Sequence, residues 1–197
     1  MHATIAEPLL AAGLSILLIA TLAGILVLTV LNLRTPRTAA LAAAAGLLVV
    51  ATIVAAISPV DVPILVSVVI AMLGLAVAVL GGNPATRVVL GLATGGRVRE
   101  TADGGILIGA PRPHPGSEEL EPLLRGGTTI GYLERVAVSM GIIAGFPEAI
   151  AVVVAIKGIG RFSELAAAEA RERFIVGTFS SLVWAAVAGA LVRLAIW

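Results

Sequence analysis

The sequence predicts an all-α protein, a polytopic bundle of about six transmembrane helices with one cytoplasmic loop. Of its 197 residues, 59% are hydrophobic and 13% are charged, and the mean hydropathy is +1.09. A soluble domain carries about 25% charged residues, so this chain cannot bury its apolar side chains in one globular core. The apolar runs are long and rich in Ala and Leu rather than alternating. That pattern favours helices over a barrel, the two structures that satisfy the backbone in lipid.

Three apolar spans come first, and we expect them at Pro8 to Leu33, Thr38 to Ile57 and Ile64 to Leu80. None of them contains an ionisable residue inside the apolar run, which is typical of scaffold helices. The first eight residues lack the Lys or Arg of a signal peptide, so we expect the first span to remain as a membrane anchor. Residues 1–82 are therefore assigned to an N-terminal unit of three transmembrane helices.

Residues 83–129 form the expected cytoplasmic loop. The composition changes at Gly81, after which Gly, Pro and charged residues dominate and no apolar run is long enough to span. The segment from Arg97 to Ile108 predicts a small hairpin around Asp103-Gly104. A short acidic helix is expected from Ser117 to Leu124.

Residues 130–197 contain three further apolar stretches, Ile130 to Phe146, Ala149 to Ile159 and Phe174 to Ile196. The first two are either one long helix or a hairpin broken at Pro147, with each arm near the lower length limit for crossing about 30 Å of hydrocarbon. A hairpin with the N-terminus outside places twelve of the thirteen Lys and Arg residues on the cytoplasmic side. A single helix places the basic group from Lys157 onward outside, against the positive-inside rule. The charge distribution favours the hairpin, with both termini outside.

Ionisable residues gather at the cytoplasmic side of this C-terminal unit. Glu134 and Lys157 lie 13 residues before and 10 residues after Pro147, so at about 1.5 Å per residue they lie at similar depth and can pair across the hairpin. Charges inside membrane spans indicate function by default. The alternative is that they pin short helices together and anchor them at the headgroups. The candidate site residues are Glu134, Arg135, Lys157, Arg161, Glu172 and Thr178.

Other side chains suggest packing and anchoring roles. Gly141 with Gly145, and Ala185 with Gly189, have the small-residue spacing that lets membrane helices approach closely. Tyr132, Trp184 and Trp197 are expected as interfacial anchors.

Composition also excludes several classes of function. The net charge of +1 argues against a basic surface that would bind nucleic acid. The chain has no cysteine, so it forms no disulfide and has no thiolate metal ligand or cysteine nucleophile. The two histidines, His2 and His114, are too far apart to indicate a zinc site. We therefore expect no metal, no cofactor and no catalytic residue.

Three motifs carry a resemblance. They are Gly131-Tyr132-Leu133-Glu134-Arg135, then the segment from Ala155 to Leu165, then the segment from Glu172 to Thr178, with Gly145-Phe146-Pro147-Glu148-Ala149 between the first and the second. The pattern G-x-L-E-R, A-x-K-x-x-x-R-F and E-x-F-I-x-G-T resembles a group of small bacterial, often actinobacterial, integral membrane proteins with no established activity. It covers residues 126–181. The resemblance implies a membrane protein and points to the same charges, but it implies no substrate.

Three functions follow as hypotheses. The first is a non-catalytic membrane subunit or scaffold that holds a protein partner through residues 83–129, in the inner membrane of a bacterial cell. The second is a small transporter or channel component that uses the charge cluster. The third and weakest is an intramembrane enzyme that modifies lipid, since no catalytic pairing is visible in the spans. A homo-oligomer is compatible with so many small residues.

Overall fold

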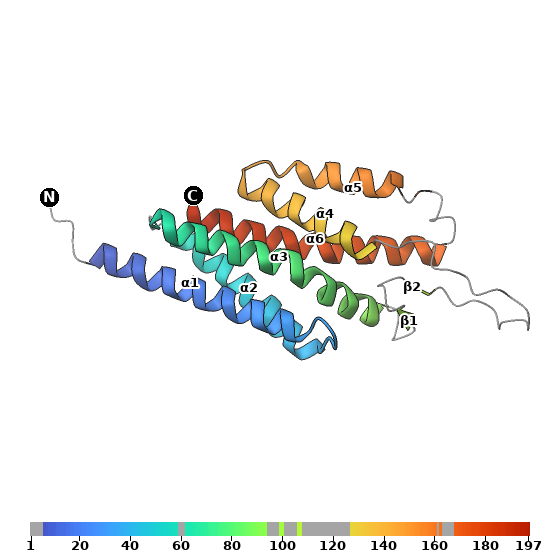
Figure 1. The fold of residues 1–197 in the computed structure, drawn as a ribbon, viewed down its shortest axis with the longest axis horizontal. Helices are drawn as coiled ribbons and strands as arrows, with labels where there is room; N and C mark the ends of the chain where they lie inside the picture. Colours follow the sequence, from blue (N-terminus) through green and yellow to red (C-terminus); the bar gives the residue numbers. More distant parts are fainter. Residues whose placement is uncertain are drawn as a thin grey trace, which may run out of the picture.

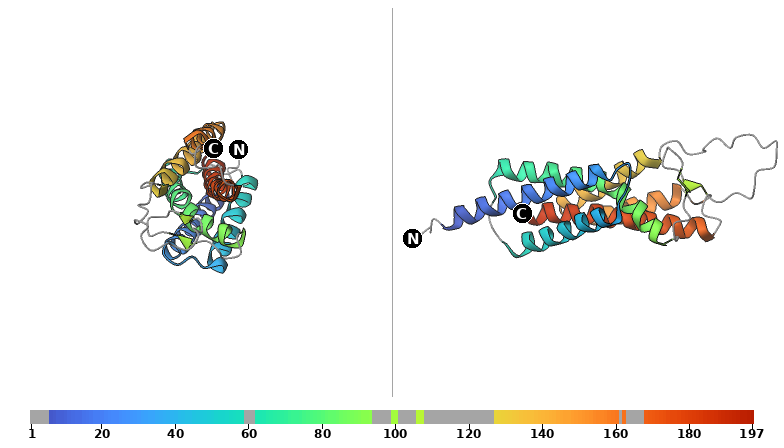
Figure 2. Two further views of the ribbon diagram at one scale, coloured as in Figure 1. Left: turned by 90° about the vertical axis from the view of Figure 1, so that its right-hand side faces the viewer. Right: turned by 90° about the horizontal axis from the view of Figure 1, so that it is seen from below.

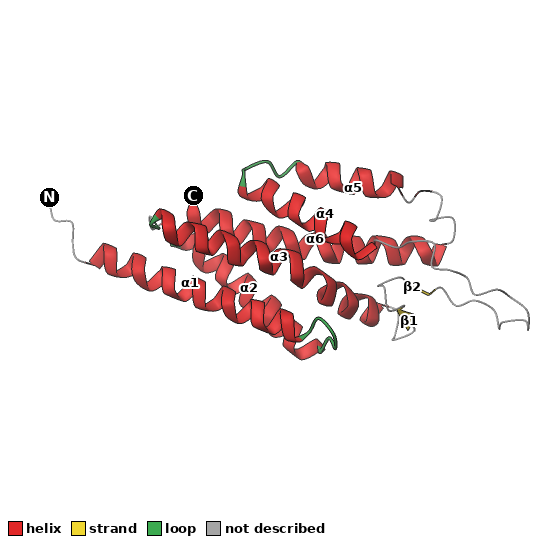
Figure 3. Cartoon of the chain, viewed as in Figure 1, coloured by secondary structure: helices red, strands yellow, loops and turns green. Residues whose placement is uncertain are grey.

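A computed structural model gives the fold and describes residues 6–58, 62–93, 99–100, 106–107, 127–160, 162 and 168–197. In these parts of the chain there are six helices and one small strand pair (Figure 3). The helices are α1 (Ala6–Leu31), α2 (Thr38–Ile57), α3 (Ile64–Ala93), α4 (Gly127–Ile143), α5 (Ala149–Gly160) and α6 (Ala168–Ile196). The strands β1 (Arg99–Glu100) and β2 (Ile106–Leu107) pair antiparallel between α3 and α4.

The predicted all-α bundle is confirmed. The helices run side by side along one long axis (Figures 1 and 2). Among the described residues four helices are long and apolar enough to cross a membrane, namely Pro8–Leu31, Thr38–Ile57, Ile64–Ala93 and Ala170–Ile196. α5 is apolar but has only 12 residues, about 18 Å of helix, which is shorter than a hydrocarbon core of about 30 Å.

Helices α3 and α6 form the centre of the bundle. They share the largest interface, while α1 packs on α3, and α2 and α4 pack on α6. The buried core includes Leu22 of α1, Leu48 of α2, Val77 of α3 and Leu191 of α6. Many other large apolar side chains point outward, as expected where lipid takes the place of water.

The hairpin is confirmed: α4 and α5 are separate antiparallel helices rather than one long helix (Figure 1). α4 ends in a Schellman motif, in which the amides of Gly145 and Phe146 donate to the carbonyls of Ile142 and Gly141 at 3.0 and 2.7 Å. Gly145 adopts a φ of 80°, the left-handed conformation this motif requires. Pro147 follows, where a helix cannot continue. Within the described chain, α5 makes its one extensive interface with α4, and none of its residues is buried.

The third span is longer than predicted. We expected it to end at Leu80 and the loop to begin at residue 83, but α3 continues to Ala93. The sequence Gly81-Gly82-Asn83-Pro84 has the composition of a turn, yet it lies inside a helix that packs on α6. α6 also begins earlier than expected, at Ala168.

The predicted strand pairing in the loop is present, with Arg99 opposite Leu107 and Glu100 opposite Ile106. Its turn at Asp103-Gly104 and the acidic segment from Ser117 to Leu124 lie outside the described residues.

Candidate functional site

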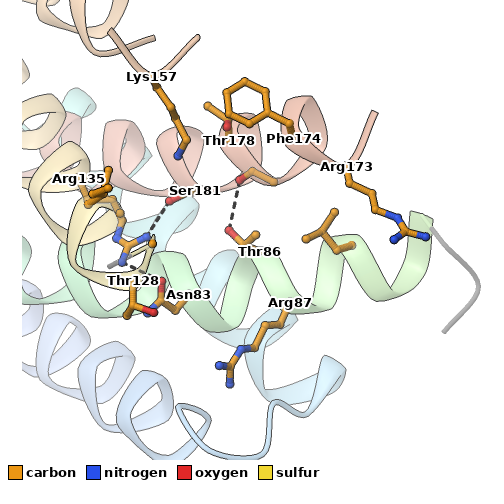
Figure 4. Close-up of a pocket in the computed structure, with 15 residues that line it drawn as sticks. Asn83, Thr86, Arg87, Thr128, Arg135, Lys157, Arg173, Phe174, Thr178 and Ser181 are labelled. Carbon is orange, nitrogen blue, oxygen red and sulfur yellow. Dashed lines mark hydrogen bonds between the residues drawn. The ribbon is translucent and has the colours of Figure 1, made fainter. Parts of the chain in front are cut away.

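A polar pocket of about 200 Å³ opens between α3, α4 and α6, at the end of the bundle where α4 begins (Figure 4). Lys157 of α5 reaches into it from one side (Figure 4). The lining contains four cationic side chains, and none of its fifteen described residues is acidic. The cations are Arg87, Arg135, Lys157 and Arg173.

A bend in α3 shapes one wall of this pocket. Pro84 lies inside the helix, where it lacks the N–H that would bond to the preceding turn and its ring pushes the helix out of line. The second half of α3 accordingly runs in a different direction from the first (Figures 1 and 2). The two glycines just before the bend admit side chains from other helices. A Cβ on Gly81 would overlap the Trp184 indole, and one on Gly82 would overlap the Arg135 side chain.

Arg135 is the centre of the site. Its side chain is 2% exposed. Nε donates to the Val79 carbonyl at 2.7 Å, Nη1 to the Ser181 hydroxyl at 2.8 Å, and Nη2 to the Asn83 side-chain carbonyl at 2.9 Å. The guanidinium carbon also lies 5.1 Å from the centre of the Tyr132 ring. All of these partners are neutral, so the buried positive charge has no carboxylate bonded to it among the described residues.

Glu134 and Lys157 form the ion pair that their depths predicted. The ammonium donates to Oε2 at 2.5 Å, and the side chains are 19% exposed for Lys157 and 9% for Glu134. Glu134 is not part of the pocket lining. Lys157 therefore joins α5 to α4 while its ammonium remains at the pocket wall.

Thr178 of α6 supplies a hydroxyl with no hydrogen-bond partner among the described residues. The residue lines the pocket and is 6% exposed. Helical Ser and Thr commonly donate to the carbonyl four residues earlier, as Ser139 and Ser180 do at 2.7 and 2.6 Å. Thr178 makes no such bond, so its hydroxyl is available to the pocket.

Arg87 relates the position of the pocket to the end of α1. Its Nη1 donates at 3.1 Å to the carbonyl of Leu33, just beyond the end of α1, where the helix dipole favours a cation. Its side chain points away from the centre of the pocket (Figure 4). Asn83 is four residues earlier on α3, so the polar floor lies about one helical turn, roughly 6 Å, inside the end of α1.

The structure brings together four of the six predicted site residues. Glu134, Arg135, Lys157 and Thr178 lie at or beside the pocket. Glu172 is exposed and borders a separate shallow depression with Arg171. Arg161 lies outside the described residues.

Sequence reasoning missed the contribution of α3. Asn83, Thr86 and Arg87 line the pocket, but they were assigned to the loop because the sequence becomes rich in Gly, Pro and charged residues from Gly81 onward. Ser181 was also missed, since the pair Ser180-Ser181 in an apolar helix gives no signal of a bonded partner.

Trp184 corrects the interfacial-anchor prediction. It is 7% exposed, and its indole N–H donates at 2.8 Å to the Val77 carbonyl inside the bundle. Trp197 is exposed at the end of the chain, and the Tyr132 hydroxyl accepts from the Asn83 amide at 3.3 Å. The packing prediction for Gly189 agrees with the structure, because a Cβ there would meet the Ser139 backbone at 3.0 Å.

In the part of the chain that the structure describes, no three His, Cys, Asp or Glu side chains gather as a metal site would require. What the site offers instead is a set of hydrogen-bond donors around a positive pocket.

No protein-family model, no curated protein and no solved structure matches this chain. The resemblance of residues 126–181 to small bacterial membrane proteins therefore stays a prediction.

Proposed function

We propose that this integral membrane protein binds an anionic ligand in the pocket between α3, α4 and α6. The observation that carries the proposal is Arg135, a buried guanidinium held by neutral partners at a pocket wall. A buried cation is costly without a counter-charge. The neighbouring Glu134 attracts Arg135 but is bonded to Lys157, and an anion from outside the chain supplies a counter-charge bonded to the guanidinium.

The donor inventory supports an anion as well. A guanidinium has five N–H donors and an ammonium has three. Arg135 uses three of its five, and Lys157 uses one of its three, on Glu134. Two N–H groups on each side chain remain, together with the Thr178 hydroxyl. The first turn of α4, which includes Gly127 and Thr128, also lines the pocket with the positive end of its helix.

We further propose that the pocket faces the cytoplasm of a bacterial cell, with both chain termini outside. The support is the positive-inside distribution of Lys and Arg, combined with a bundle in which Arg87 reaches the end of α1 near Arg34. The hairpin returns Lys157 to the same end.

This proposal develops the second of the three sequence hypotheses, a transporter or channel component that uses the charge cluster. The scaffold hypothesis depends on residues 83–129, most of which lie outside the described chain, and it stays a prediction, as does a homo-oligomer. Among the described residues that line the pocket, no arrangement of acid, base and nucleophile favours the enzyme hypothesis.

The test is the thermal stability of purified protein in detergent against a panel of sodium salts at one ionic strength. A ligand that binds the folded state raises the unfolding midpoint in proportion to RT ln(1 + [L]/Kd). We expect at least one anion to raise it for the wild type, with the rise reduced in Lys157→Gln. Thr29→Val is the matched control, because Thr29 does not line the pocket. If no anion raises the unfolding midpoint of the wild type, the proposal is wrong. It is also wrong if every anion raises the midpoints of wild type and Lys157→Gln by the same amount.

A further inference from the structure

We infer that the ligand of this pocket is a tetrahedral oxyanion of the phosphate type, either inorganic phosphate or a phosphate monoester group. The inference rests on the proposed function, and it names the ligand class. It depends on how many donors surround the pocket, from how many directions they come, and how large the pocket is.

The donors come from three helices. Arg135 is on α4, Lys157 on α5 and Thr178 on α6, and all three line the same cavity (Figure 4). A carboxylate has two oxygens in one plane, which a single guanidinium fork can satisfy. A phosphate group presents three or four oxygens in different directions. Donors on three sides of the cavity match the second geometry better than the first.

The charge of the site favours an anion. Glu134 is bonded to the Lys157 ammonium and also attracts the neighbouring Arg135 guanidinium, whose printed hydrogen bonds all run to neutral groups. Two cations and one carboxylate therefore meet here among the described residues, and an oxyanion offsets the remaining positive charge.

The size of the cavity limits the ligand to a group rather than a large molecule. Its volume of about 200 Å³ is below the usual range of about 300–1,000 Å³ for small-molecule sites. A phosphate with a small substituent fits, and anything larger must extend through the opening. Both a soluble phosphate ester and a phospholipid headgroup meet this condition.

Thr178 distinguishes a pocket that offers directed hydrogen bonds to an oxyanion from a region that is only positively charged. The residue is 6% exposed and lines the cavity, and its hydroxyl has no protein partner among the described residues. Thr29 has a fully buried hydroxyl without a partner in the described chain, but it lies on α1 and does not line the cavity. The same Thr→Val substitution at the two positions therefore separates ligand binding from the general effect of removing a buried hydroxyl.

The experiment is equilibrium binding of ³²P-labelled inorganic phosphate to the full-length, delipidated protein in detergent, with succinate, sulfate, glycerol 3-phosphate and dihexanoyl phosphatidic acid as competitors. We expect saturable binding that succinate does not displace. Sulfate should compete, because none of the described lining residues is a carboxylate that could select for a protonated oxygen. Thr178→Val should weaken binding about 5- to 10-fold, Thr178→Ser should restore most of it, and Thr29→Val should leave it unchanged.

The outcomes separate this inference from the proposed function. If phosphate does not bind and the salt panel shows that carboxylates do, the ligand class is wrong while the anion pocket stands. If no anion binds, both are wrong. If phosphate binds equally to wild type and Thr178→Val, the assigned site is wrong. Among positive results, competition at least 10-fold stronger for dihexanoyl phosphatidic acid than for glycerol 3-phosphate assigns the phosphate to a lipid headgroup, and equal competition assigns it to a soluble ester.

Discussion

Removing the charge of Lys157 should loosen the α4–α5 hairpin more than removing both members of its ion pair. Two unit charges about 4 Å apart attract by about 4 kcal/mol at an effective dielectric constant near 20. The 2.5 Å contact is closer than this, and the side chains are only 19% and 9% exposed. Desolvation and side-chain ordering offset part of the attraction. We therefore expect Lys157→Met to lower the free energy of unfolding by about 2–3 kcal/mol, because it leaves the Glu134 carboxylate partly buried without its cation.

The double variant Lys157→Met with Glu134→Gln should lose only about 1–2 kcal/mol, because no unpaired charge remains. The assay is a double-mutant cycle, with unfolding followed by circular dichroism in mixed detergent micelles. Glu148→Gln serves as the control, since Glu148 is exposed in the turn between α4 and α5 and should change stability by less than about 0.5 kcal/mol. If the two single effects add to the double effect within about 0.5 kcal/mol, the pair does not hold the hairpin and the reasoning is refuted.

Three further predictions use the same unfolding assay. Thr29→Val should raise stability by about 1 kcal/mol, because it removes a buried hydroxyl that has no partner in the described chain; an unchanged or lower value would contradict this. Gly189→Ala should lower stability by about 1–2 kcal/mol by forcing α6 away from α4, whereas Gly24→Ala, where an added Cβ meets nothing within 4 Å, should raise it by about 0.4–1 kcal/mol, and equal effects would refute the close-approach argument. Trp184→Phe should cost about 1–2 kcal/mol by leaving the Val77 carbonyl without its 2.8 Å donor; a neutral result would show that this bond is not stabilising.

The fold could be predicted largely because it follows from segment length and from Pro147. The apolar runs give the positions of the helices, and the charge distribution distinguishes a hairpin from one long helix. Counting residues from Pro147 gave the Glu134–Lys157 pairing, which the structure contains. These features depend on local sequence and on helix rise alone.

The pocket could be predicted only in part because its α3 wall depends on tertiary contacts. Gly81 and Gly82 resemble a turn, but in the fold they are the points where Trp184 and Arg135 pack against α3. Those contacts, together with the hydrogen bond from Arg135 to Val79, stabilise a helix through a sequence that would otherwise break it. Asn83 then lies inside the bundle rather than in a loop. No spacing rule applied to one segment can show that another segment supplies the partner.

The partners of Arg135 also bear on how the protein enters the membrane. Its three hydrogen bonds run to Val79 and Asn83 on α3 and to Ser181 on α6, and α6 is synthesised after α4. An arginine in an inserting helix is costly, up to about 2.5–3.5 kcal/mol where it lies at the centre of the bilayer. Until α6 arrives, α4 lacks Ser181, and α5 is too short to cross unaided. The order of insertion should therefore differ from the order of synthesis, with α4 and α5 reaching their final depth only after α6 has entered the bilayer.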